Sequence, residues 1–440
     1  MNGYAEKILH ANLETGEMRE EPFPEGWRRA YIGGRGLGVR ILQDLVDPGI
    51  DPLSPENVLV IATGPLAGSG LPVGSRYGVT AKSPLTGTLS SSNSGGKFGT
   101  SLKRAGYDAI VVHGRAERPV YIHIDDGEAR IRDASDLWGM TTAEATATLQ
   151  KEMGDPALSV ACIGPAGERL VRFAAIINET SRAAGRGGLG AVMGSKNLKA
   201  VTASGNGRIT VADHDRFTAL KREMAEKIRK NPISGEGLPG FGTAVLVNII
   251  NENYILPTRN FQTAHFPAAE KVSGERMAES ILVGKMGCQG CIIRCGRDVE
   301  VEGKRTAGPE YETIWAFGPD CGIDDLAAVV EANNICNDLG LDTISTGSTI
   351  ACAMELSERG YIQDEIRFGD AELMLDLVQR IGYREGIGDE LAEGSFRFAR
   401  KHGHPELSMS VKRQELPAYD PRGLQGHGLA YATSVRGGDH

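Results

Sequence analysis

Long apolar runs and a targeting segment are both missing from this sequence. No stretch reaches eighteen consecutive apolar residues, so we expect no transmembrane helix. The first residues lack the charged-then-apolar order and the cleavage site of a secretory signal peptide. The formal net charge of -9 argues against a nucleic-acid partner, because such a partner requires a basic face. We therefore expect a cytoplasmic protein without a membrane span.

Aromatic side chains are also sparse, at 6% of the residues, whereas glycine is abundant. Glycine occupies 58 of the 440 positions, and its usual share of a protein is about 7%. Such a number predicts many positions where the backbone adopts a positive φ or approaches another group closely. The chain is long enough for two or three domains, each with a sizeable core.

Cysteine is scarce and odd in number, with seven residues in all. In a large cytoplasmic chain this is poor evidence for a disulfide framework and better evidence for metal ligands and buried thiols. Cys288, Cys291 and Cys295 form a C-x2-C-x3-C motif flanked by glycines. Thiolates suit an iron–sulfur cluster or zinc, so a structural zinc knuckle remains an alternative. Either site needs a fourth ligand, for which Cys321 is the nearest candidate unless it is simply packed.

The order of strand and helix patterns predicts an α+β fold. Short β-branched runs at 58–64, 108–114 and 119–127 end in turn residues, which is typical of strands. Amphipathic or capped helices are expected from Asp213 to about 230, over 324–339 and over 343–358. We therefore predict a strand-rich N-terminal domain over 1–210, a mainly helical domain over 211–417, and the start of a third, truncated helical domain over 418–440.

Two glycine-rich loops stand out, SNSGGKFG over 92–99 and SRAAGRGGLG over 181–190. The second contains the dinucleotide pattern GRGGLG, but its preceding residues have no strand pattern and no long apolar helix follows it. An NAD-binding fold is therefore disfavoured. Arg182 and Arg186 flank this loop, and Arg76 precedes the other. Glycine-rich backbone with arginines is typical of phosphate binding, although solvated loops without a ligand have the same composition.

Two carboxylates are candidates for acid–base chemistry. Glu310 and Glu312 lie beside Trp315 and Phe317. If the segment is strand-like, both carboxylates share a face and an aromatic wall raises one pKa. An ordinary salt-bridged pair is the alternative. NDLGLD over 337–342 is by itself a corner between two helices, in which Asp342 opens the second, and a lone histidine such as His440 is usually a surface or packing residue.

Together these residues resemble the tungsten-dependent aldehyde:ferredoxin oxidoreductases. The resemblance runs in order through YIGGRGLGVRIL, SRYGVTAKSPLTG, SNSGGKFG, SRAAGRGGLGAVMGSKNLKA, CQGCIIRC, GPEYET, NDLGLD and AYDPRGLQGHGLAYATSVRGGDH. It implies a bis-pterin tungsten centre (molybdenum is the lesser alternative), a [4Fe–4S] cluster and a magnesium ion that bridges the pterin phosphates. It also places GRGGLG in a pterin loop, which removes the dinucleotide interpretation.

The resemblance implies a role for each matching residue. The first pterin would lie against Arg76, Asn93, Gly95, Arg182, Ala183, Gly185 and Arg186, with the backbone carbonyls of Asn93 and Ala183 on magnesium. The second pterin would meet Asn337, Leu341 and Asp342. Arg436, one turn before His440 if that segment is helical, would be a further pterin contact. Glu312 and His440 would face the metal, and Cys288, Cys291 and Cys295 would hold the cluster.

The sequence departs from the family in three respects. Asn337 stands where the family has aspartate. The fourth cluster cysteine and a second D-x-x-G-L motif come after the block that ends at His440, so we expect a further C-terminal segment. Some members have an E-x-x-H motif for a mononuclear iron, whereas here Glu331 is followed by Ala332, Asn333 and Asn334, and we expect no such iron.

The implied reaction is oxidation of an aldehyde to the carboxylic acid, with electrons passing through the cluster to a ferredoxin-like protein or subunit. Glu312 would act as the general base, and His440 would donate a hydrogen bond or carry a proton. One alternative is a reductive member that acts on an aromatic thioester or carboxylic acid. The other is a non-catalytic iron–sulfur electron-transfer subunit. An oligomer is compatible with either.

Overall fold

The structure is a computed structural model that describes residues 2–439, and the chain divides into two compact units. Unit 1 comprises Met1–Ile228, Gly287–Ile292 and Asn337–Leu341. Unit 2 comprises Arg229–Met286, Ile293–Cys336 and Asp342–His440. Two short pieces from the second half of the chain, the first cysteines and most of NDLGLD, therefore belong to the N-terminal unit.

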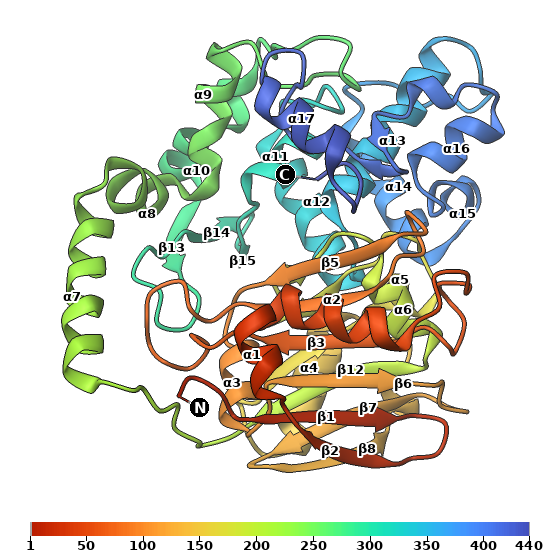
Figure 1. The fold of residues 1–440 in the computed structure, drawn as a ribbon. Helices are drawn as coiled ribbons and strands as arrows, with labels where there is room; N and C mark the ends of the chain where they lie inside the picture. The colour runs from red at the N-terminus through yellow and green to blue at the C-terminus, as the bar shows by residue number, and fades with distance from the viewer. Residues whose placement is uncertain (1, 440) are drawn as a thin grey trace. The chain divides into compact units, whose positions relative to one another are not determined.

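Unit 1 contains two six-stranded sheets (Figure 1). Sheet A has the order β2-β1-β6-β3-β4-β5 and consists of β1 (Lys7–Asn12), β2 (Met18–Pro22), β3 (Leu59–Thr63), β4 (Tyr77–Lys82), β5 (Leu89–Ser94) and β6 (Ala109–His113). Only β1 and β6 pair in parallel, and the other neighbours are antiparallel.

Sheet B has the order β11-β10-β9-β12-β7-β8. It consists of β7 (Val120–Asp125), β8 (Glu128–Asp133), β9 (Ser159–Cys162), β10 (Ile176–Asn178), β11 (Arg182–Ala184) and β12 (Leu198–Ser204). Here β7 and β12 are the parallel pair. The strands are short and β-branched, as the sequence predicts for β3, β6 and β7.

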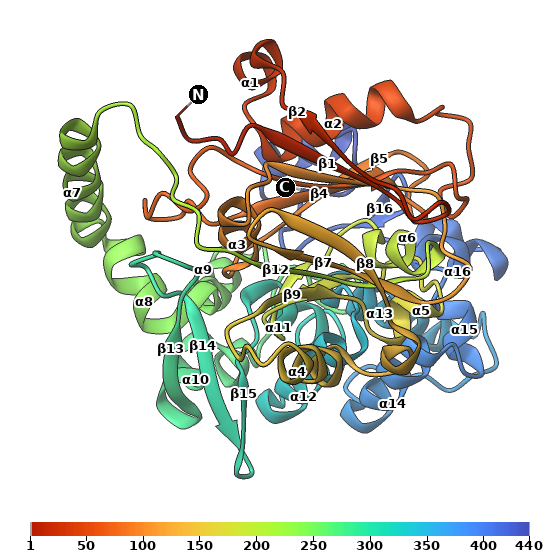
Figure 2. The ribbon, with the colours of Figure 1, turned by 90° about the horizontal axis from the view of Figure 1, so that it is seen from below.

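The main core of unit 1 lies between the two sheets. It contains Ile61 and Val79 of sheet A together with Ile122 and Val201 of sheet B, all at most 1% exposed. A second core lies between the outer face of sheet A and α2 (Gly34–Leu45), and a third between sheet B and α4 (Thr142–Glu152). Figures 1 and 2 show α2 and α4 on these outer faces. The other helices of the unit are α1 (Glu25–Tyr31), α3 (Phe98–Arg104), α5 (Pro165–Glu168), α6 (Leu189–Ser195) and most of α7 (His214–Lys230).

Unit 2 is mainly helical. Its helices are α8 (Leu238–Phe241), α9 (Leu246–Glu252), α10 (Gly274–Ser280), α11 (Tyr311–Phe317), most of α12 (Leu326–Leu339), α13 (Thr343–Glu358), α14 (Ala371–Tyr383), α15 (Ile387–Leu391), α16 (Ser395–Lys401) and α17 (Gln425–Thr433). Two small antiparallel sheets complete it, β13 (Leu282–Met286) with β14 (Gly296–Val301) and β15 (Lys304–Ala307), and β16 (Ser410–Val411) with β17 (Gln414–Glu415).

The predicted α+β class, strand-rich first and helical afterwards, is confirmed. Helix α13 is buried along almost its whole length and packs against α11. One helical stretch, Pro232–Glu252, is long and apolar enough by composition to qualify as a membrane span. It consists of several short helical pieces interrupted at Gly242, whose φ is +68°. The predicted absence of a membrane span therefore remains a prediction.

Candidate functional site

The loop 92–99 is held beside sheet B by the buried side-chain amide of Asn178 and by the carboxylate of the neighbouring Glu179, whose Oε2 accepts from the N–H of Lys97 at 3.0 Å. Asn178, at the end of β10, accepts hydrogen bonds on Oδ1 from Ser94 Oγ at 2.5 Å and from Tyr77 Oη at 2.9 Å. Its Nδ2 donates to the carbonyl of Gly95 at 3.0 Å. Asn178 is fully buried, so these bonds satisfy an amide that would otherwise be costly to desolvate. No local sequence pattern points to Asn178, because Tyr77, Ser94 and Gly95 are between 83 and 101 residues away along the chain.

The first cysteines of the predicted cluster lie against the same loop. A β-carbon added at Gly95 would lie 2.6 Å from Cys288 Sγ. The backbone N–H of Gln289 donates to the carbonyl of Gly96 at 3.0 Å. The cysteine segment itself turns, with the N–H of Cys291 bonded to the carbonyl of Cys288 at 2.9 Å. The structure therefore brings together a predicted pterin loop and two predicted cluster ligands.

The arginine-rich loop 181–190 reaches the same place from sheet B. Strands β10 and β11 form a hairpin in which Asn178 pairs with Arg182 and Ile177 with Ala183. The expectation that no strand precedes GRGGLG is therefore wrong, because the hairpin is held by cross-strand pairing that the polar residues 178–184 do not reveal. The backbone N–H of Arg186 donates to Ser92 Oγ at 3.2 Å, which joins the two glycine-rich loops. The pair is antiparallel and α6 has seven residues, so the arrangement is not a dinucleotide-binding βαβ unit.

The predicted contacts of the first pterin thus lie on neighbouring segments of unit 1. The register of β4 and β5 pairs Gly78 with Asn93 and Tyr77 with Ser94, so Arg76 comes opposite Gly95. The side chains of Arg76, Asn93 and Ala183 are exposed. Cationic side chains next to glycine-rich backbone suit a phosphorylated ligand.

The NDLGL segment also docks on unit 1, beside the start of β10. Leu341 forms an isolated antiparallel bridge with Ala174, and the N–H of Ala175 donates to the carbonyl of Gly340 at 2.8 Å. The carbonyl of Asn337 accepts from Thr142 Oγ1 at 2.8 Å. Gly340 has a φ of +75°, which favours glycine at this helix end. This segment therefore lies at the beginning of β10, and the loop 181–190 follows its end.

Asp342, the last residue of NDLGLD, belongs to unit 2. Its carboxylate accepts hydrogen bonds from the backbone N–H groups of Ile344 and Ser345, both at 3.3 Å, and from Ser345 Oγ at 2.7 Å. It is the N-cap of α13, as the alternative interpretation of this motif predicts.

Glu312 lies in the first turn of α11, and Glu310 is the N-cap of that helix. The strand-like arrangement of these two carboxylates is therefore wrong, because the apolar positions of 311–317 follow a helix buried in unit 2. Glu312 Oε2 accepts from the backbone N–H of Ala418 at 3.0 Å, whereas Glu310 Oε2 accepts from Thr243 Oγ1 at 2.6 Å. Each carboxylate therefore has its own hydrogen-bond donor, and the alternative of an ordinary salt-bridged pair stays a prediction.

Two tyrosines, Tyr311 and Tyr419, lie close to Glu312, and no local sequence pattern singles them out. Tyr311 Oη donates to the carbonyl of Ala418 at 2.7 Å, and its ring lies 5.5 Å from that of Tyr419. Burial raises the pKa of both tyrosines, and the charge of Glu312 adds to the effect. The ring of His427 follows, 4.6 Å from Tyr419. The segment AYDPRGLQGHGLAYA therefore supplies an aromatic wall next to Glu312, in place of Trp315, which is fully buried in the core.

The end of the segment is less regular than expected. Helix α17 ends at Thr433, so Arg436 is not part of a helical turn leading to His440. Arg436 forms an ion pair with Asp439. His440 lies outside the described residues.

The third cysteine precedes a buried arginine in unit 2. The guanidinium of Arg297 donates to the carbonyls of Pro239 at 3.0 Å, Gly240 at 2.7 Å and Arg294 at 2.6 Å. Burial lowers its pKa, and the nearby Cys295 acts in the opposite direction. Within residues 2–439, no three histidine, cysteine, aspartate or glutamate side chains converge into a metal site.

Cys321 does not have the environment of a metal ligand. It is fully buried, and its thiol donates to the carbonyl of Ala316 at 3.2 Å. Burial raises its pKa well above the ordinary value, which disfavours the thiolate. Of the two interpretations of Cys321, a fourth metal ligand or a packed thiol, the packed thiol fits the structure.

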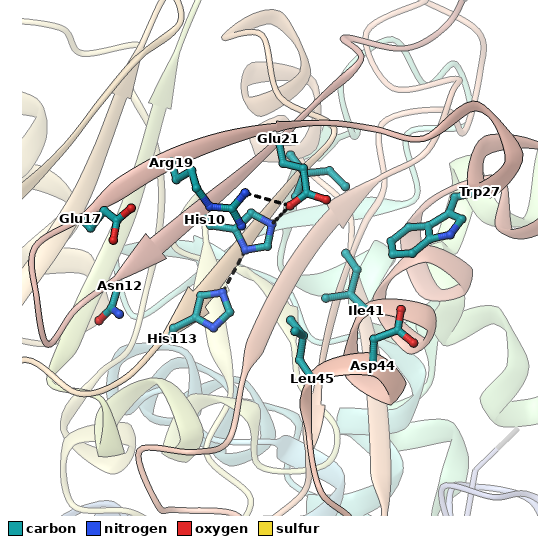
Figure 3. Close-up of a pocket in the computed structure, with 11 residues that line it drawn as sticks. His10, Asn12, Glu17, Arg19, Glu21, Trp27, Ile41, Asp44, Leu45 and His113 are labelled. Atoms are coloured by element: carbon teal, nitrogen blue, oxygen red, sulfur yellow. Dashed lines mark hydrogen bonds and ion pairs between the residues drawn. The ribbon is translucent and has the colours of Figure 1, made fainter.

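A separate cavity of about 360 Å³ lies on the outer face of sheet A (Figure 3). Its polar side holds His10, whose Nδ1 lies 3.0 Å from Nε2 of His113 and whose Nε2 lies 3.2 Å from Oε2 of Glu21. Burial lowers the pKa of His113 to about 4. This cavity contains none of the predicted site residues.

Comparison with known proteins covers both units. The family model of the aldehyde ferredoxin oxidoreductase N-terminal domain matches residues 8–205, and the model of domains 2 and 3 matches residues 219–440. Tungsten-containing aldehyde ferredoxin oxidoreductases of Pyrococcus furiosus and Thermococcus kodakarensis are 53% and 52% identical over the whole chain, which spans 74% of each relative.

Two more distant relatives are also similar. An aliphatic sulfonate oxidoreductase, WOR-like subunit, of Pyrococcus furiosus is 33% identical over the whole chain and 75% of its own length. Among solved structures, the active site complex BamBC of benzoyl coenzyme A reductase in complex with 1,5 dienoyl-CoA has a TM-score of 0.87 and 28% identity. That match covers 99% of this chain and 69% of the other.

Proposed function

The chain belongs to the aldehyde ferredoxin oxidoreductase family, and on that premise we propose that it oxidises an aldehyde at a tungsten centre held by pterins. The products are the carboxylic acid, two protons and two electrons, and the electrons pass through a [4Fe–4S] cluster to a ferredoxin-like acceptor. The observation that carries this proposal is the contact between Gly95 and Cys288, because it joins a phosphate-binding type of loop to the cysteine motif.

The residues of unit 1 fit the implied cofactor. Arg76, Arg182 and Arg186 provide cationic groups for phosphates, and Gly95 leaves room for a close approach. We propose the backbone carbonyls of Asn93 and Ala183 for magnesium, Asn337, Leu341 and Asp342 for the second pterin, and Arg436 as a further pterin contact. When bound, the pterin-held tungsten supplies a two-electron acceptor and a Lewis acid for the carbonyl.

The chain's own chemistry centres on Glu312. We propose that one Glu312 oxygen takes a proton from the water that adds to the aldehyde carbon, while Ala418 N–H holds the other oxygen. We propose that Tyr311 and Tyr419 limit the access of solvent to this half-buried carboxylate. His440 is proposed as the hydrogen-bond donor to the developing oxyanion, and Cys288, Cys291 and Cys295 as cluster ligands.

Metal analysis and an aldehyde assay test this function together. The purified protein should contain tungsten and iron, and should reduce benzyl viologen with acetaldehyde or benzaldehyde as substrate. Iron without tungsten or molybdenum would instead indicate an electron-transfer subunit.

The similarity to the BamBC complex favours a second candidate, reduction of an aromatic thioester. That relative is 28% identical, whereas the aldehyde-oxidising relatives are above 50% identical. Dienoyl-CoA formation from benzoyl-CoA, without aldehyde oxidation, would establish this alternative.

A further inference from the structure

We infer that helix α7 and the adjoining cysteine loop form the docking surface for a small acidic iron–sulfur electron carrier. This inference rests on the proposed function, which requires such an acceptor. The 17-residue helix (Figure 1) contains six lysines and arginines against three acidic residues, in a chain whose net charge is -9. An acidic protein is therefore repelled by most of the chain and attracted here.

Two cations of α7 are available to a partner. Glu223 pairs with Lys227, so that lysine is already neutralised. Lys221 and Arg222 are exposed, and no carboxylate within residues 2–439 forms an ion pair with either. The helix has no buried residue, and Leu220 on its apolar stripe is 47% exposed. Apolar groups flanked by charges are typical of a transient protein interface.

Helix α7 and the cysteine loop both lie close to one glycine, Gly70. Lys221 Nζ is 3.1 Å from the position of a β-carbon at Gly70. A β-carbon at Gly290, between Cys288 and Cys291, would lie 3.7 Å from the α-carbon of Gly70. One backbone segment thus contacts both α7 and the loop of the predicted cluster ligands, so a carrier bound to α7 lies close to the electron exit.

Further cations flank the other side of this loop. Gln289 lines a cavity of about 640 Å³ together with Lys97 and Arg104. Two aspartates, Asp125 and Asp155, share the cavity, so its formal charges balance. The net positive charge next to the cysteine loop therefore comes from α7.

Charge reversal on α7 tests the inference in the full-length holoenzyme. The double variant Lys221→Glu/Arg222→Glu is compared with Arg29→Glu/Arg118→Glu, which makes the same change in net charge at two exposed arginines elsewhere in unit 1. We expect the first variant to raise the KM for an acidic two-cluster ferredoxin about tenfold and to weaken its salt dependence. The control should stay within about twofold, and the kcat with benzyl viologen should be unchanged in both.

Three outcomes would overturn the inference while leaving the proposed function intact. They are an unchanged KM for ferredoxin in the α7 variant, an equal rise in the control, and dissociation of an oligomer by the α7 variant, which would make α7 a contact between copies. Absence of aldehyde-dependent viologen reduction in the unmodified protein would instead reject the proposed function. Direct titration with ferredoxin at low salt measures docking independently of turnover.

Discussion

The thiol of Cys288 lies so close to Gly95 that a β-carbon at this glycine would come within 2.6 Å of the sulfur. The carbonyl of the same glycine is held by the buried Asn178 amide at 3.0 Å. The cysteine motif is therefore positioned by a loop almost two hundred residues earlier in the chain. This contact makes the two sites interdependent.

Replacing Gly95 with alanine should displace the cysteine loop. A β-carbon cannot approach a sulfur atom at 2.6 Å, so the Cys288 side chain or the loop must shift, at a cost of about 1–3 kcal/mol. We expect iron and acid-labile sulfide per protein to fall by more than about half, because ligand geometry is strict. Gly64→Ala is the matched control, since a β-carbon there meets nothing within 4 Å. Full iron content in the Gly95 variant would contradict the proposed role of Cys288.

Asn178→Leu should destabilise unit 1 through polar groups left without their partner. Three buried hydrogen bonds disappear while the carbonyl of Gly95 stays buried. Each unsatisfied group costs about 1–3 kcal/mol, and the free energy of unfolding from urea titration should fall by that order or more. Asn206→Leu is the control, because its amide lies at the surface and bonds only the exposed Asp126. If the free energy of unfolding falls no more than in the control, Asn178 does not hold the loop in place.

Glu312→Gln should abolish turnover without loss of metal. The amide oxygen can still accept the N–H of Ala418, so the local fold is retained, but the proton acceptor is gone. Removal of a general base lowers kcat by about 10²–10⁴. The comparison is Glu310→Gln, whose carboxylate accepts from Thr243. Near-normal kcat in the Glu312 variant, with tungsten bound, would refute its assignment as the base.

Asp320 should make the stability of unit 2 fall as pH rises. This residue is fully buried, and burial raises its pKa from 3.8 to about 8. The folded state therefore binds a proton between pH 4 and 8 that the unfolded state has lost. The stabilisation is complete below pH 4 and is lost as pH approaches 8.

The test is the pH dependence of the free energy of unfolding in Asp320→Asn. Between pH 5 and 8 the unmodified protein should lose several kcal/mol, of the order of 1.4 kcal/mol per pH unit, and the variant should lose markedly less. Asp324→Asn at the surface, where Asp324 pairs with Lys271, should retain the unmodified slope. Parallel curves for the protein and its Asp320 variant would reject the raised pKa.

Local patterns in the sequence were sufficient to predict several strands and helices and the family. The turn-bounded strands β3, β6 and β7 and the capped helices α7, α12 and α13 appear where predicted, because periodicity and caps act over a few residues. The ordered motifs also led to the family, which the comparisons confirm.

The tertiary structure determined which residues that are far apart in the sequence come into contact. The polar residues of β10 and β11 form strands only because neighbouring strands satisfy their backbone, and Glu312 lies on a helix because α11 is buried against α13. The contact of Cys288 with Gly95, the Asn178 amide and the Lys221–Gly70–Gly290 path all join residues far apart in the chain. Such contacts depend on how the two sheets pack together, which no local sequence pattern encodes.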